Sequence, residues 1–150
     1  MSAPEPTLSL VTLGVSDLKR SIAFYEALGF RRKATKADGV GFFQAGAVIF
    51  AVWPAGELAK DANAAVAAVA AADAPAFRGV ALAWNCRSPA EVEAAIERAR
   101  RAGASVPKAA QNTIWGGYAG YFADPDRHLW ELAYNPHWPF TDDDRLTLPD

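Results

Sequence analysis

The chain has 150 residues, of which 51% are hydrophobic, and its formal net charge is −2 at pH 7. This length is typical of one compact domain or two very small modules, and it allows a core that needs no disulfide or metal to fold. The small net charge and the lack of a long basic run argue against nucleic-acid binding, because phosphate recognition needs clustered Lys and Arg.

A strand and a helix are predicted to open the chain. Residues 7–15 alternate in the manner of a strand. A helix is predicted over residues 18–28, because Ser16 and Asp17 can cap its first turn and Gly29 can end it in the left-handed conformation. Shorter strands are predicted at 30–33, 41–43 and 48–50.

The same order of elements returns in the second half. A strand is predicted over residues 80–86. A helix follows the capping residue Ser88, with Pro89 at its first position and Glu91 three residues after the cap, and Gly103 ends it. The remaining strands are predicted at 120–122 and 129–132. This internal repeat predicts an α+β fold built from tandem βαβββ modules.

The predicted modules leave a connection and a tail. Module 1 spans about residues 7–54, the connection 55–78, module 2 79–136 and the C-terminal tail 137–150. The connection is rich in alanine, so a helix is predicted over 57–72 from propensity alone. The tail is predicted to be extended and irregular, with Trp138 and Phe140 anchored on the protein's own surface or on a neighbour's.

Cysteine content and hydropathy indicate the cellular compartment of the protein. Cys86 is the only cysteine, so an intrachain disulfide is impossible, and a buried apolar thiol is favoured over a nucleophile. Residues 1–7 do not resemble a signal peptide, and no window approaches the roughly 20 apolar residues of a membrane span. We expect a cytoplasmic protein without a membrane partner.

Several short motifs together resemble one protein family. They are VSDL at 15–18, FY at 24–25, LGF at 28–30, GGY at 116–118, GYFADPD at 120–126 and HLWE at 128–131. With the repeat, they resemble the vicinal oxygen chelate superfamily, which includes glyoxalase I, extradiol dioxygenases and bleomycin-resistance proteins. The resemblance covers about residues 8–136. It implies that the modules form cup-shaped mixed sheets and that the protein is a homodimer.

The resemblance also bears on metal binding. Enzymes of this superfamily hold a divalent metal with inward-facing His, Gln or Glu on the first and last strands of each module. The matching positions in this chain are Leu10, Ala51, Ala81 and Glu131. Only Glu131 carries a donor atom, and one carboxylate cannot hold the ion. The sequence therefore predicts no metal centre of the family type and no cofactor.

Two histidines and one arginine complete this comparison. His128 lies three residues before Glu131 and so should point to the opposite face of the strand. His137 lies in the tail and could reach a site only if the tail folds back, so structural roles are predicted for both histidines. Arg127 stands where the family commonly has glycine, which would cost about 1 kcal/mol if that backbone is left-handed.

A cup lined by small side chains predicts a small-molecule pocket. The candidate ligand-binding residues are Thr12, Asn85, Trp53, Trp115, Tyr118, Tyr121 and Glu131. Glu131 could attract a cationic or hydrogen-bond-donating ligand, or act as a catalytic general base. It could equally be a structural carboxylate satisfied by Thr12, Asn85 or a tyrosine hydroxyl.

These features favour a metal-free small-molecule-binding protein of the bleomycin-resistance type, which sequesters a drug or metabolite. The alternative is an enzyme related to lyases, isomerases or dioxygenases that uses a relocated metal or Glu131 as a base. A third possibility is an interaction module with no ligand.

Overall fold

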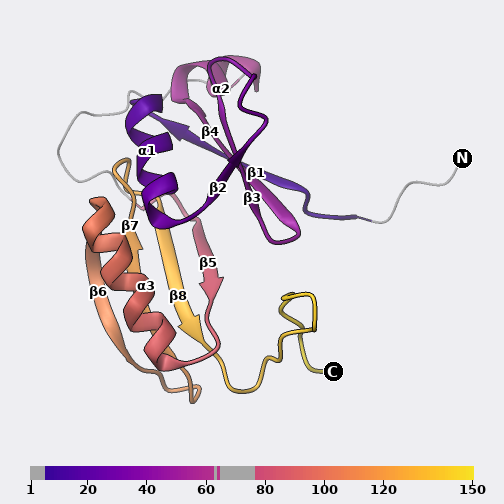
Figure 1. The fold of residues 1–150 in the computed structure, drawn as a ribbon, viewed down its shortest axis with the longest axis vertical. Helices are drawn as coiled ribbons and strands as arrows, with labels where there is room; N and C mark the ends of the chain where they lie inside the picture. The colour runs from indigo at the N-terminus through magenta and orange to yellow at the C-terminus, as the bar shows by residue number, and fades with distance from the viewer. Residues whose placement is uncertain (1–5, 63, 65–76) are drawn as a thin grey trace, which may run out of the picture.

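The computed structural model describes residues 6–62, 64 and 77–150, and these form two four-stranded sheets and three helices (Figure 1). The first half contains β1 (Leu10–Val15), α1 (Leu18–Leu28), β2 (Arg31–Lys33), β3 (Gly41–Ala45) and β4 (Val48–Pro54). The rest contains α2 (Ala55–Asp61), β5 (Ala81–Asn85), α3 (Pro89–Ala102), β6 (Ser105–Asn112), β7 (Tyr118–Ala123) and β8 (Leu129–Tyr134). The predicted α+β fold with tandem βαβββ units is confirmed.

The two sheets have the same strand order. Sheet A runs β1-β4-β3-β2 and sheet B runs β5-β8-β7-β6. In each sheet the first and last strands of the unit pair in parallel, and the other neighbours are antiparallel. Figure 1 shows α1 and α3 next to each other, and residues of the two helices are in contact. The internal repeat read from the sequence is therefore a repeat of topology.

Both long helices begin and end at the residues that the sequence predicts. The Asp17 side chain accepts a hydrogen bond from the Arg20 backbone N–H at 3.0 Å, and Gly29 ends α1 with φ of 106°. The Ser88 side chain caps α3 in the same way, and Gly103 ends it with φ of 105°. A left-handed residue at the end of a helix favours glycine, which has no Cβ to clash.

The structure differs from the predicted elements in two strands and in the connection. Strand β1 begins at Leu10 rather than Thr7. Strand β6 was not predicted, because its sequence SVPKAAQN is mostly exposed and lacks an apolar alternation. Helix α2 begins at Ala55, and most of the helix predicted over 57–72 lies outside the described residues. Among the described helices, none is long and apolar enough to cross a membrane.

One aromatic core serves both sheets. Phe43 of β3 stacks on Phe50 of β4, with ring centroids 4.8 Å apart, and Phe122 of β7 stacks on Trp130 of β8 at 5.9 Å. The ring of Tyr25, on α1, lies 4.8 Å from Phe50 and 6.0 Å from Trp130. Because Tyr25 contacts at least one ring of each stacked pair, the two units share a core rather than having one each.

A buried polar cluster inside this core joins the two halves. The Tyr25 hydroxyl donates to Asp124 Oδ2 at 2.7 Å, and Trp130 Nε1 donates to the same hydroxyl at 3.2 Å. The Asp124 side chain is fully buried and also lies 2.8 Å from His128 Nδ1. Burial acts to raise the pKa of Asp124, but the hydrogen bonds and charge of His128, with the hydrogen bond from Tyr25, lower it overall.

A second contact between the halves lies at the start of α1. Asp126 Oδ1 accepts hydrogen bonds from the Ser16 backbone N–H at 2.9 Å and from its hydroxyl at 2.6 Å. Asp126 Oδ2 accepts from the Ser21 hydroxyl at 3.2 Å, and Arg20 lies 3.6 Å from the carboxylate. The DPD turn at 124–126 therefore connects the second half to α1 through both of its carboxylates.

We expect Tyr25→Phe to destabilise the protein by about 1–3 kcal/mol, because it leaves the buried Asp124 carboxylate and Trp130 N–H without one partner each. Urea unfolding followed by circular dichroism measures this loss. Tyr118→Phe is the control, since its hydroxyl bonds to the exposed Glu93, and it should change the free energy of unfolding by less than about 0.5 kcal/mol. Equal losses from both variants would contradict the proposed role of the buried cluster.

Candidate functional site

Glu131 lies at the centre of sheet B, on the face turned away from the core. Its neighbours Trp130 and Leu132 are buried in the core, so the alternation of β8 places Glu131 on the opposite face. Directly beside it are Ala83 on β5 and Tyr121 on β7. The small side chain of Ala83 leaves the carboxylate accessible from that side.

A cavity of about 530 Å³ lies over this face, and we refer to it as the Glu131 cavity. Its lining residues are Ala83, Asn85, Trp115, Glu131, Ala133, Asn135, His137 and Trp138. They combine small apolar side chains, two indole rings, two amides, one imidazole and one carboxylate. A concave, largely apolar site with a few polar groups is the usual form of a small-molecule pocket.

Three of the residues predicted from the sequence meet in this cavity, namely Asn85, Trp115 and Glu131. Sequence reasoning missed the contribution of the tail. The His137 backbone N–H donates to Asn135 Oδ1 at 3.0 Å, and the Trp138 N–H donates to the Asn135 carbonyl at 3.3 Å. This turn directs the chain back after β8, so His137 and Trp138 both join the cavity wall.

The tail beyond this turn is irregular, as predicted, and rests on the protein's own surface. The Arg87 guanidinium lies 4.5 Å above the centre of the Phe140 ring, and the same arginine pairs with Asp144. The only regular pairing in the described tail is one bridge between Phe140 and Leu146. These contacts hold the part of the tail beyond the Asn135 turn against the rest of the protein.

Tyr121 and Glu131 interact on the face of sheet B that is turned away from the core, which we call the cup face. Burial raises the pKa of the Tyr121 hydroxyl, and the charge of Glu131 together with a hydrogen bond to it raises the pKa further. The Tyr121 hydroxyl is therefore a hydrogen-bond donor held beside the Glu131 carboxylate. Tyr121 does not line the Glu131 cavity itself, and its hydroxyl interacts with Glu131 instead.

The other predicted site residues lie elsewhere. Tyr118 is three residues from Tyr121, so the alternation of β7 turns it to the opposite face, where its hydroxyl donates to Glu93 of α3. Thr12 lines a different cavity, beside β1. Trp53 lies on β4 of sheet A, which contributes no residue to the Glu131 cavity. The sequence predicts that Thr12, Trp53 and Glu131 share one cup, but in the structure they do not line one cavity.

The donor set does not fit a divalent metal. The register places Thr12 beside Ala51 in sheet A and Ala83 beside Glu131 in sheet B. Within the part of the chain that the structure describes, no group of three or more His, Cys, Asp or Glu side chains could hold an ion. In the Glu131 cavity only Glu131 and His137 are common metal ligands, and two ligands are fewer than such sites use.

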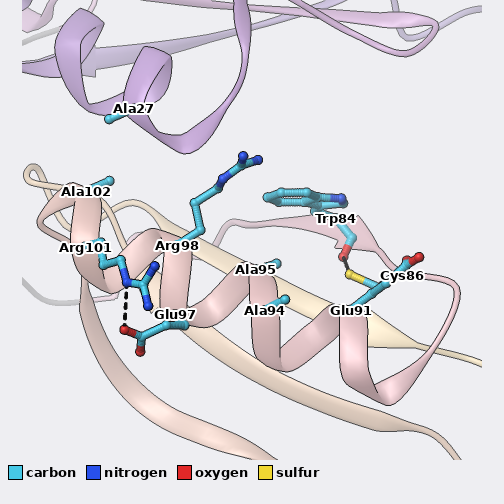
Figure 2. Close-up of a pocket in the computed structure, with 10 residues that line it drawn as sticks. All are labelled: Ala27, Trp84, Cys86, Glu91, Ala94, Ala95, Glu97, Arg98, Arg101 and Ala102. Carbon is cyan, nitrogen blue, oxygen red and sulfur yellow. Dashed lines mark hydrogen bonds and ion pairs between the residues drawn. The ribbon is translucent and has the colours of Figure 1, made fainter.

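A larger hollow of about 760 Å³ lies between α1 and α3 (Figure 2). Its charged groups are already engaged, because Arg101 pairs with Glu97 and Arg98 donates to the Leu28 carbonyl at 3.4 Å. Burial raises the pKa of the Cys86 thiol to about 11, and the charge of Glu91 adds to this. The predicted burial of the thiol is confirmed, and its raised pKa disfavours the reactive thiolate at neutral pH.

Comparisons with known proteins agree with the fold. A model of the Glyoxalase/Bleomycin resistance protein/Dioxygenase superfamily matches residues 7–132. A glyoxalase-related enzyme from Fulvimarina pelagi is 34% identical, with a TM-score of 0.82 over 96% of this chain and 99% of that one. A glyoxalase/bleomycin resistance protein/dioxygenase from Nocardioides is 28% identical, with a TM-score of 0.67 over 89% and 85%.

A lactoylglutathione lyase from Agrobacterium tumefaciens shares the fold, with 19% identity and a TM-score of 0.64 over 92% of this chain and 100% of that one. No curated protein sequence matches the chain.

We expect Glu131→Gln to lower the pKa of Tyr121, because the substitution removes the negative charge that opposes ionisation of the hydroxyl. Burial persists, so the pKa should remain above its ordinary value. Carbon NMR of the tyrosine rings, assigned with Tyr121→Phe, measures the titration. Tyr118 is an internal control: its pKa is raised by Glu93, so only Glu93→Gln should lower it. If Glu131→Gln leaves Tyr121 unchanged, the pair does not interact.

Proposed function

Since this chain belongs to the Glyoxalase/Bleomycin resistance protein/Dioxygenase superfamily, we propose that it is a small-molecule-binding protein that holds its ligand in the Glu131 cavity without a metal. The ligand is a small organic cation with an apolar body, such as an amine-bearing drug or metabolite. The observation that carries this proposal is one carboxylate in a cavity walled by two indole rings.

The chemistry of the wall favours a cation. Glu131 is the only acidic residue among the described residues that line the cavity, and no Lys or Arg lines it. The faces of Trp115 and Trp138 attract a cation through the quadrupole of the ring. A protonated amine could therefore pair with Glu131 while an indole ring contacts it or the neighbouring apolar atoms.

The remaining lining residues would orient the ligand. Ala83 and Ala133 flank Glu131 on the cup face and leave room for a ring or chain. Asn85 and Asn135 offer amide donors and acceptors, which fix orientation without adding charge. Sequestration needs only this binding.

Binding is tested by the quenching of tryptophan fluorescence with a panel of aromatic amines and their neutral amide analogues. We expect the amines to bind in preference, and Glu131→Gln to weaken them about tenfold or more, since it removes a charge-assisted contact. Glu93→Gln makes the same change on the α3 side of sheet B and should leave affinity unchanged.

Trp115→Phe and Trp138→Phe identify the quenched ring and should each weaken binding less than Glu131→Gln does. Amides that bind as tightly as amines, or a Glu131→Gln variant with unchanged affinity, would remove the carboxylate from the site. No response to any compound would favour an interaction module without a ligand.

An enzyme is the second candidate function, and the pairing of Glu131 with the Tyr121 hydroxyl favours it, with His137 in the same cavity. Glu131 would serve as the base and His137 as a proton acceptor or donor. A relative that is 34% identical is described as a glyoxalase-related enzyme. Turnover of a bound compound that is abolished by both Glu131→Gln and His137→Ala would establish catalysis.

We also propose a cytoplasmic homodimer. Trp115 and Trp138 of the Glu131 cavity are 43% and 37% exposed, and Ile114, which precedes Trp115 in the chain, is fully exposed. Covering such side chains stabilises association. Light scattering coupled to gel filtration should give twice the chain mass, and Ile114→Glu should shift the equilibrium to monomer. A monomer at every concentration would contradict the dimer and leave the binding proposal standing.

A further inference from the structure

A cavity of about 770 Å³ lies between strand β5, the turn that joins β3 to β4, and the C-terminal tail. We refer to it as the tail cleft. Residues 83–85 of β5 and residues 45–48 of the turn line two of its sides, and Phe140 and Leu146 line it from the tail. In Figure 1 the tail lies close to the tip of the β3–β4 hairpin. The tail cleft thus brings together three segments that are far apart in the sequence.

Aromatic rings line the tail cleft from the body of the protein and from the tail. The ring of Phe30 lies 5.8 Å from Trp84 and 5.6 Å from Trp130, so these three form one cluster. Phe140 lines the same cleft, but among the described residues its ring contacts only the Arg87 guanidinium, at 4.5 Å, and no other ring. A ligand ring in the cleft would therefore meet aromatic surface from both the body and the tail.

The charged side chains of the tail cleft balance one another. They are Arg87, Glu91, Asp144 and Arg145. Arg87 pairs with Asp144, and Arg145 pairs with a neighbouring aspartate of the tail. The Glu91 carboxylate accepts a hydrogen bond from the Arg87 backbone N–H at 2.7 Å. Because these groups are already paired, the tail cleft favours an uncharged part of a ligand, whereas the Glu131 cavity favours a cation.

The tail cleft and the Glu131 cavity meet at β5, because Ala83 and Asn85 line both. β5 is an edge strand of sheet B, and among the described strands it pairs only with β8. The side chain of Ala83 is small, and the Asn85 amide offers a donor and an acceptor at the junction. A ligand that pairs with Glu131 can therefore extend past β5 into the tail cleft.

We propose that the ligand of the Glu131 cavity is an elongated amine with an aromatic ring at its far end, and that this ring occupies the tail cleft. This inference rests on the function proposed for the Glu131 cavity and narrows the class of its ligand. The ammonium group pairs with Glu131, an uncharged chain crosses Ala83, and the ring lies between Phe140 and the aromatic cluster of the body.

Hexylamine and 6-phenylhexylamine are the probes, because they share the ammonium group and the chain and differ only in the ring. Titration calorimetry on the full chain should give a Kd about tenfold or more tighter for 6-phenylhexylamine, since the ring is buried in the tail cleft. Glu131→Gln should weaken both amines by a similar factor, because both pair with the carboxylate.

Two substitutions act on the tail cleft and leave the lining of the Glu131 cavity unchanged. Phe140→Ala removes one ring, and Ala47→Phe fills the cleft from the exposed turn. Each should reduce the ratio of the two dissociation constants by about threefold or more. Because Ala47→Phe changes no residue of the tail, it decides the question even where Phe140→Ala shifts the tail. Phe77→Ala is the matched control, since this phenylalanine is 69% exposed and lines neither cavity.

Equal affinity for the two amines would overturn the inference and leave the Glu131 cavity as a site for short amines. An advantage of 6-phenylhexylamine that survives both Phe140→Ala and Ala47→Phe would also overturn it, because the ring would then be bound elsewhere. Failure of both amines to bind would overturn the proposed function and this inference with it.

Discussion

The hydrogen bond between the Tyr25 hydroxyl and the Asp124 carboxylate is the contact on which the arrangement of the two halves depends. It joins residues 99 positions apart in the sequence, and it lies where the aromatic side chains of both sheets meet. A buried carboxylate is costly unless its hydrogen bonds are satisfied. Asp124 accepts from Tyr25, His128 and the Asp126 backbone N–H, so its burial fixes the orientation of the β7–β8 turn.

That orientation separates two chemical environments on sheet B. On one side of the turn, β8 carries Glu131 to a face lined by alanines and indoles. At the turn itself, Arg127 and His128 line a different cavity, in which no Asp or Glu is found among the described lining residues. The two regions are only a few residues apart in the chain, yet they line different cavities, because a strand turns alternate residues to opposite faces and the turn adds a left-handed residue.

The sequence predicted the repeated topology and both long helices because the signals for these are local. Asp17, Ser88, Gly29 and Gly103 act within one turn of a helix. The alternation of β8 also placed Glu131 on the cup face correctly. The edge strand β6 was missed because an exposed strand with proline and lysine carries no apolar period.

The site was predicted less completely because its remaining contacts are not local. Tyr118 was assigned to the cup together with Tyr121, although their spacing of three places them on opposite faces. His137 lines the Glu131 cavity because the turn at Asn135 directs the chain back, and hydrophobic periodicity does not predict such a turn. Thr12 and Trp53 were grouped with Glu131 because a repeated module suggests one shared cup, whereas the packing of Tyr25 against both sheets determines where each face points.

The two stacked aromatic pairs occupy equivalent places in the duplicated topology: Phe43 and Phe50 face each other across β3 and β4, and Phe122 and Trp130 across β7 and β8. Each pair contacts a ring of the other half: Phe50 contacts Trp130, and Phe122 contacts Phe24. A single unit of this topology would therefore leave part of its aromatic pair open to water unless it associated with a second copy. In this chain the same contact lies inside one molecule, so the two units bury their aromatic pairs against each other at any protein concentration.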